Sequence, residues 1–122
     1  MVTTLEHEKK TFAHPDDIRT FEKGRIEVVN VGGTTIGLTV LQPGWRWSTC
    51  VKPLVHTELC EVSHLMCMIS GRMRVKMEDR TEFDLAGGDI STIPPGHDAW
   101  VMGNEPAVGF DIAGAGNYAK PD

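Results

Sequence analysis

The chain has 122 residues, of which 40% are hydrophobic and 24% are charged, and its formal net charge is -5. A chain of this length buries about two-thirds of the surface that it exposes when unfolded, so it needs no disulfide framework, and its three cysteines are expected to be reduced thiols or ligands. The net negative charge does not favour binding to nucleic acid, and no apolar run approaches the ~18 residues of a membrane span. We therefore expect one domain, residues 1–122, whose partners are small molecules or proteins. Because the N-terminus lacks the pattern of a secretory signal, we expect a cytoplasmic protein.

The first 24 residues are predicted to form an N-terminal extension with one short helix. In the stretch HPDDIRTFE, Pro15 suits the first helical position, and Asp16 and Asp17 suit the positive end of the helix dipole. Residues 25–31 and 34–42 are rich in β-branched side chains and flank a Gly-Gly pair, which predicts a β-hairpin. A long strand-like segment then runs over residues 45–69 and is broken near Pro53.

The second half of the chain predicts further strands. Residues 72–77 read RMRVKM, in which basic and apolar side chains alternate, so one face of this strand should meet solvent and the other the core. Additional strands are expected at residues 81–85, 89–93, 99–102 and 107–112. Short strands punctuated by thirteen glycines and seven prolines are typical of an antiparallel sandwich or barrel. The sequence thus predicts an all-β fold.

Two short motifs stand between the predicted strands: SGRM at residues 70–73 and AGGDISTIPPG at residues 86–96. In the second, five residues separate Gly88 from Pro94, Pro95 and Gly96. With the order of the strands and turns, these motifs resemble the cupin superfamily, whose second motif has this glycine and proline frame. The resemblance covers residues 34–112. It implies a cupin-type double-stranded β-helix, also called a jelly-roll barrel, and a metal ion, and it suggests a homodimer.

The resemblance leaves two registers open for the first cupin motif, which carries two histidines and a glutamate in the family. Counting back from Gly71 places His64 at the glutamate position and puts Cys60 and Glu58 where the histidine pair would stand. Counting forward from Gly44 instead puts the pair at residues 50 and 52, which are cysteine and lysine. In the second motif the family histidine falls on residue 99, an alanine, while His97 lies two residues earlier.

Strand geometry suggests a different metal site. Residues two apart on a strand point to the same face, so His56, Glu58, Cys60 and His64 would share a face if this segment were regular. In a cupin barrel this region lies beside the second motif, which would bring Cys60, His64 and His97 to one point. A thiolate and two imidazoles suit a divalent ion, and we expect Fe, Zn or Mn.

The predicted site also has members beyond the three ligands. We predict His56 and Cys50 as reserve ligands and Glu58 as a catalytic residue. Three roles are open for Glu58: a fourth metal ligand, a hydrogen-bond acceptor that fixes the tautomer of an imidazole, or a general base. The predicted pocket wall comprises Trp45, Trp47, Met66 and Trp100.

Two functions follow as hypotheses. The first is a metal-dependent enzyme of dioxygenase, isomerase or lyase type acting on a small organic substrate. The alternative is a metal-free, non-catalytic module that binds a small molecule. For either, we expect a homodimer and neither nucleic-acid nor membrane partners.

Overall fold

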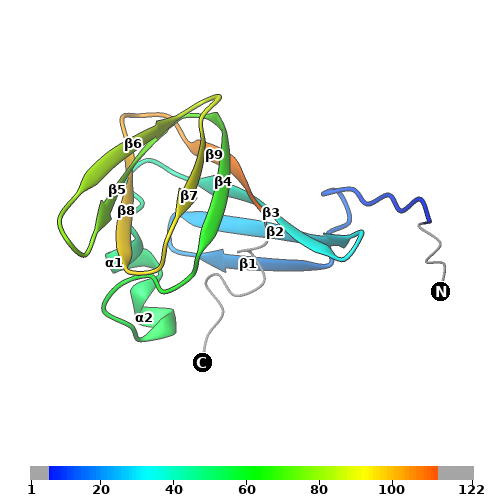
Figure 1. The fold of residues 1–122 in the computed structure, drawn as a ribbon, viewed down its shortest axis with the longest axis horizontal. Coiled ribbons are helices and arrows are strands. Elements are labelled where there is room, and N and C mark those ends of the chain that lie inside the picture. The colour runs from blue at the N-terminus through cyan, green and yellow to red at the C-terminus, as the bar shows by residue number, and fades with distance from the viewer. Residues whose placement is uncertain (1–5, 113–122) are drawn as a thin grey trace.

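The computed structural model describes residues 6–112, which form two antiparallel β-sheets that face each other (Figure 1). The larger sheet has the strand order β1-β2-β3-β9-β4-β7, and the smaller has the order β6-β5-β8. The elements are β1 (Asp17–Phe21), β2 (Gly24–Val31), β3 (Thr34–Leu41), α1 (Trp47–Cys50), α2 (Lys52–Val55), β4 (His64–Ser70), β5 (Arg72–Met77), β6 (Glu82–Ala86), β7 (Ile90–Ile93), β8 (His97–Met102) and β9 (Ala107–Ile112).

The predicted β-hairpin is confirmed, since β2 and β3 are joined in this way next to the edge strand β1 of the larger sheet. β2 and β3 pair over their whole length, from Gly24 opposite Leu41 to Val31 opposite Thr34. Apolar side chains on the inner face of this pair join the core between the sheets, whose largest fully buried apolar members are Ile26, Leu41, Trp47, Val51 and Val75. This hairpin therefore forms one wall of the core.

The predicted N-terminal helix is wrong, because this segment forms the edge strand β1. β1 pairs antiparallel with β2, with Asp17 opposite Val28 and Phe21 opposite Gly24. Asp16 does not begin a helix; its carboxylate accepts a hydrogen bond from the backbone N–H of Asn30 at 2.7 Å. The edge of β2 offers a ladder of backbone hydrogen bonds, and this tertiary pairing outweighs a weak local helix signal.

The predicted long strand over residues 45–69 is only partly correct. Residues 47–55 form the two short helices, which Figure 1 shows at one end of the sandwich, and only His64–Ser70 form a strand, β4. Pro53 lies in the first turn of α2, where its missing N–H costs little, and His56 ends this helix with a positive φ of 60°. The loop after α2 brings the chain back toward β8.

The turn between β4 and β5 depends on a glycine that the sequence motif contains. Gly71 has a φ of +76°, and a Cβ there would collide with the backbone carbonyl oxygen of Pro106. Beyond it, the alternation predicted for β5 is confirmed, since Met73 and Val75 are buried while Arg72 and Lys76 are exposed. Within residues 6–112, no helix is long and apolar enough to cross a membrane.

Candidate metal centre

Cys60 and His97 are joined by their backbones. Cys60 donates its N–H to the carbonyl oxygen of His97 at 2.8 Å, and His97 donates its N–H to that of Cys60 at 3.3 Å. Residues directly opposite each other in an antiparallel pair point their side chains to the same face. This bridge therefore aims the thiol and the imidazole in the same direction.

The turn before β8 fixes the orientation of the His97 ring. Its Nδ1 lies 2.7 Å from the carbonyl oxygen of Pro94. A carbonyl only accepts hydrogen bonds, so Nδ1 carries the proton and the Nε2 lone pair of the neutral ring is available. The side chain is 3% exposed. The Pro-Pro-Gly turn thus presents His97 with the tautomer that a metal ligand requires.

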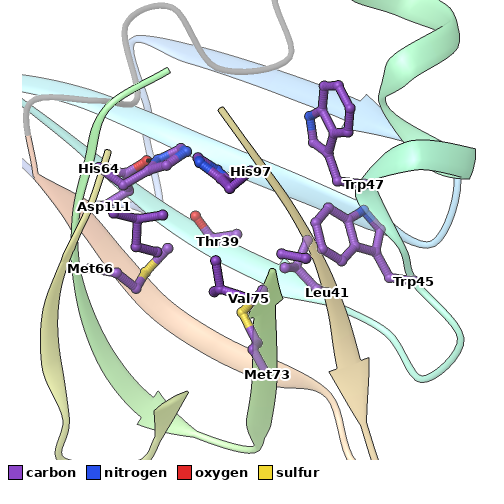
Figure 2. A pocket seen from close by; sticks show the side chains of 12 residues that line it. Thr39, Leu41, Trp45, Trp47, His64, Met66, Met73, Val75, His97 and Asp111 are labelled. Carbon is purple, nitrogen blue, oxygen red and sulfur yellow. Dashed lines mark hydrogen bonds and ion pairs between the residues drawn. The ribbon is translucent and has the colours of Figure 1, made fainter. Parts of the chain in front are cut away.

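A buried carboxylate orients His64, the first residue of β4. Its Nδ1 donates to Asp111 Oδ2 on the neighbouring strand β9 at 2.6 Å (Figure 2). Asp111 is 1% exposed and His64 is 7% exposed. A histidine whose Nδ1 donates to a carboxylate has its ring orientation fixed and its Nε2 made more basic.

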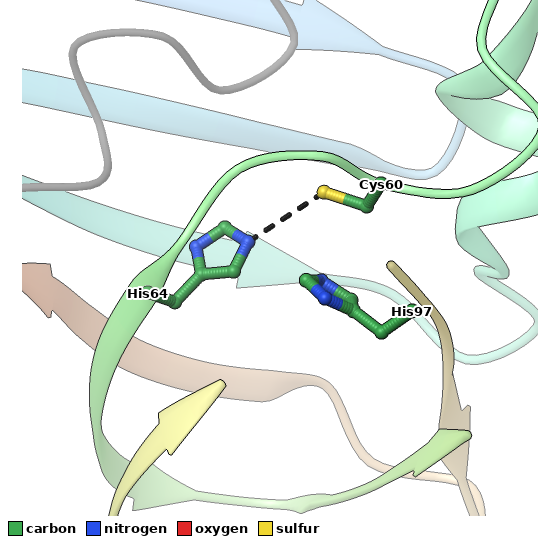
Figure 3. A group of neighbouring side chains, drawn as sticks. All are labelled: Cys60, His64 and His97. Carbon is green, nitrogen blue, oxygen red and sulfur yellow. Dashed lines mark hydrogen bonds between the residues drawn. The ribbon is translucent and has the colours of Figure 1, made fainter. Parts of the chain in front are cut away.

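The three side chains converge on one point between the sheets (Figure 3). The potential ligand atoms of Cys60, His64 and His97 all lie within 4.8 Å of one another, and Cys60 Sγ is 3.7 Å from His64 Nε2. The two imidazole rings are 5.1 Å apart between centroids. Bonds of about 2.0 to 2.3 Å to a shared ion place such atoms roughly 3 to 4 Å apart. Small side-chain movements would therefore suffice for all three to bind one ion.

The thiol and the imidazole shift each other's ionisation. Burial raises the pKa of the Cys60 thiol, but its hydrogen bonds with His64 and His97 outweigh this effect and lower the pKa from 9.0 to about 7. Burial lowers the pKa of His64, but hydrogen bonds with Asp111 and Cys60 outweigh it and raise the pKa to about 9. Near pH 8 the metal-free site consequently holds a thiolate beside an imidazolium. Cys60 is thus ready to bind a cation, whereas His64 must first release a proton.

A small cavity lies beside two of these side chains, His64 and His97 (Figure 2). Its volume is about 30 Å³, enough for roughly two water molecules. The lining residues are Thr39, Leu41, Trp45, Trp47, His64, Met66, Met73, Val75, Ile93, His97, Ala99 and Asp111. Trp45, Trp47 and Met66, which the sequence analysis assigned to a pocket wall, are among these lining residues.

Three buried polar atoms in the described part of the chain have no hydrogen-bond partner, and all three belong to residues of this cavity. They are Thr39 Oγ1, Trp45 Nε1 and Asp111 Oδ1. A buried polar group without a partner costs about 1 to 3 kcal/mol, so a cluster of them calls for an explanation. The cavity is thus polar at a few defined points within a largely apolar wall.

Other predicted site residues lie elsewhere. Glu58, predicted as the catalytic residue, has 93% of its side chain exposed and accepts a hydrogen bond from Lys52 Nζ at 3.0 Å. His56 is exposed at the end of α2, and Cys50 is buried in the core beside Thr49. The segment from residue 56 to 63 is not a regular strand, so the two-residue alternation that grouped these side chains with Cys60 does not apply.

Trp100 also lies outside the cavity, for a reason that strand geometry explains. On β8, His97, Ala99 and Val101 are buried, whereas Asp98 and Trp100 point to the other face. There the Arg46 guanidinium stacks on the Trp100 ring at 4.2 Å from its centroid. Asp98 accepts a hydrogen bond from the backbone N–H of Ser48 in α1 at 3.1 Å, which helps to hold this helix against β8.

Asp111 and Thr39 were not predicted from the sequence. Asp111 is an acidic residue within the apolar run AVGFDI, and this position was the available signal. A carboxylate is rarely buried without a partner, so it could have been paired with a histidine. Thr39 carries no comparable signal, because threonine is common in strands.

Comparisons with known proteins concern the fold. No protein-family model and no curated protein matches the sequence. A Rhizobium leguminosarum structure of unknown function is similar with 21% identity and a TM-score of 0.59, covering 97% of this chain and 100% of that one. A cupin-like protein from Thermotoga maritima has 17% identity and a TM-score of 0.53, covering 76% and 70%.

A mutant of Bacillus subtilis oxalate decarboxylase is also similar, with 21% identity and a TM-score of 0.64. The match covers 95% of this chain and 32% of the decarboxylase, so the chain spans about a third of that protein's length. The sequence motif, the two-sheet architecture and these structural similarities together define the class of fold. The chain has a cupin-like fold, as the sequence predicted.

Proposed function

We propose that this protein is a metal-dependent enzyme in which Cys60, His64 and His97 bind one divalent ion. The observation that carries the proposal is the convergence of one thiol and two imidazoles, with ligand atoms within 4.8 Å of one another. The surrounding contacts fit a metal, since Asp111 and the Pro94 carbonyl hold the two Nδ1 atoms and leave Nε2 for coordination. Thiolate and imidazole ligands suit Zn(II) and Fe(II).

The proposed chemistry follows from three protein ligands, of which His64 and His97 line a cavity. Three ligands leave a coordination position for an exogenous molecule, which is typical of catalytic rather than structural sites. When bound, the ion would supply Lewis-acid or redox chemistry at that position. The chain's own residues keep the imidazoles oriented, and the indole rings of Trp45 and Trp47 exclude bulk water. A cavity of about 30 Å³ admits only a small molecule or the reacting group of a larger substrate.

The proposal is tested by measuring metal content in protein purified without an affinity tag or added metal. We expect near-stoichiometric iron, zinc or manganese in the unaltered protein, and loss of most of it in His64→Ala and in His97→Ala. His56→Ala is the matched control, because this exposed histidine lies outside the cluster, and it should retain the metal.

Two results would contradict the metal proposal. One is protein that contains no metal and takes up neither Fe(II) nor Zn(II) when these are added. The other is equal metal content in His97→Ala and His56→Ala, which would locate the ion elsewhere. If the metal is present and depends on His64 and His97, the next measurements are oxygen consumption and turnover of small keto and aromatic acids.

A second candidate function is the binding of a small molecule without a metal, which a larger groove favours. The groove has a volume of about 500 Å³ and lies between the N-terminal segment and the outer face of the larger sheet. Phe12 stacks on Phe110 there, with 5.7 Å between ring centroids, and Lys9 and Lys10 are also part of the lining. Grooves of this size and composition bind drug-sized ligands.

The groove is tested with an anionic aromatic dye, 8-anilinonaphthalene-1-sulfonate. We expect its fluorescence to rise on binding and this rise to fall in Ile36→Glu, which places a charge in the groove wall. Thr81→Glu, at an exposed site outside the groove, is the control. An equal fluorescence increase in all three proteins would contradict binding at the groove.

A further inference from the structure

Thr39 and Asp111 present two unused hydrogen-bonding atoms to the cavity beside the candidate metal centre. Thr39 is 4% exposed and Asp111 is 1% exposed, and Thr39 Oγ1 and Asp111 Oδ1 have no partner among the described residues. Figure 2 shows the Thr39 hydroxyl directed toward the two imidazole rings. Asp111 uses its other oxygen, Oδ2, to hold His64. Both atoms are therefore available to a molecule in the cavity.

The strand register explains why these atoms have no protein partner. On the adjacent strands β3 and β9, Gly37 lies opposite Asp111 and Gly109 lies opposite Thr39. Thr39 and Asp111 are thus diagonal neighbours on one sheet face, and such neighbours are about 7 to 8 Å apart at the backbone. Neither glycine has a side chain that could reach across. The residues opposite on the outer strands, Ile26 beside Thr39 and Met66 beside Asp111, are apolar and offer no hydrogen bond. One small molecule that contacts both side chains would satisfy the two unpartnered polar atoms.

We propose that Thr39 and Asp111 form a binding position for a small neutral ligand with an O–H group, such as water, a hydroperoxide or an alcohol. The Thr39 hydroxyl donates to the ligand oxygen or accepts from it, whereas a carboxylate oxygen only accepts. The ligand must therefore donate a hydrogen bond to Asp111 Oδ1. An anion such as azide would face the negative carboxylate, which disfavours it in a buried site.

The role of this ligand rests on the proposed metal-dependent function. The binding position itself can be tested in metal-free protein. The first experiment is a high-resolution crystal structure of the metal-free protein and of Thr39→Val and Thr39→Ser. We expect an ordered water within about 2.5 to 3.2 Å of both polar atoms in the unaltered protein and in Thr39→Ser. In Thr39→Val, which keeps the shape but lacks the hydroxyl, this water should be absent or displaced.

The second experiment tests the preference for a neutral ligand. In Asp111→Asn the amide oxygen still accepts from His64 Nδ1, while the NH₂ group replaces the carboxylate oxygen as a donor in the cavity. Azide binding is followed through the visible absorption of Co(II)-loaded protein. We expect azide to bind Asp111→Asn with a dissociation constant lower by about tenfold or more. Asp84→Asn, which makes the same charge change at an exposed site, should bind azide like the unaltered protein.

The outcomes separate the two proposals. Absence of solvent from Thr39 and Asp111 in the metal-free crystals, or an unchanged water in Thr39→Val, overturns the binding position whether or not metal binds. Equal azide affinity in Asp111→Asn and the unaltered protein overturns the preference for a neutral ligand. Failure of the protein to bind Co(II) counts against the metal centre, and the crystallographic test still decides the binding position.

Discussion

Replacing Asp111 with alanine is expected to lower the free energy of unfolding of the metal-free protein by about 3 to 5 kcal/mol. The Asp111 carboxylate, 1% exposed, accepts a hydrogen bond from His64 at 2.6 Å and is the main cause that raises the pKa of His64 to about 9. Without it, the protein must either keep an uncompensated buried charge or bury a neutral ring with an unpartnered donor. The same change should weaken metal binding by about 10- to 100-fold, since the carboxylate orients a ligand.

Urea denaturation of the metal-free protein at pH 7 measures this effect. Asp84→Ala is the control, because Asp84 also pairs with a cation, Arg74, but does so at the surface. Exposed ion pairs contribute little, so the control midpoint should stay close to that of the unaltered protein. If the two variants lose the same stability, the buried pair does not have the role assigned to it.

Metal affinity is expected to rise by about ten-thousandfold from pH 6 to pH 9. Only the deprotonated forms of the ligands bind, so each proton that the free site holds weakens binding as the pH falls. Below the Cys60 pKa of about 7, binding displaces protons from both Cys60 and His64, and affinity should rise by about a hundredfold per pH unit. Between pH 7 and 9 only His64 must lose its proton, which gives about tenfold per unit.

Competition against a chromogenic zinc chelator between pH 6 and pH 9 measures how steeply the zinc affinity changes with pH. Asp111→Asn is the informative control: it removes the charge that raises the pKa of His64, so the rise between pH 7 and 9 should shrink. An affinity that does not change between pH 7 and 9 in the unaltered protein would show that no imidazolium is displaced on binding.

The sequence was most informative where local pattern and tertiary structure agree. The hairpin of β2 and β3 and the alternation of β5 could be predicted because a two-residue period determines which side chains are buried. The cupin-like fold followed from the glycine and proline frame before β8. The N-terminal helix failed because the edge of β2 was available for pairing, which a local signal does not report.

The candidate site likewise combines features that a local pattern predicts with features that depend on tertiary pairing. His97 was predicted as a ligand from its turn, and Cys60 lies beside it because of a single backbone bridge rather than the regular strand assumed from the sequence. Trp100 could have been excluded from the pocket by applying the alternation that buries His97. Asp111 meets His64 only through the pairing of β4 with β9, a contact between residues 47 positions apart that no local pattern contains.

Anomalous X-ray diffraction from crystals of the metal-loaded protein tests the central claim most directly. The account predicts one strong peak within about 2.0 to 2.3 Å of Cys60 Sγ, His64 Nε2 and His97 Nε2. A peak at other side chains, or its absence from crystals of protein shown to contain the metal, would contradict it.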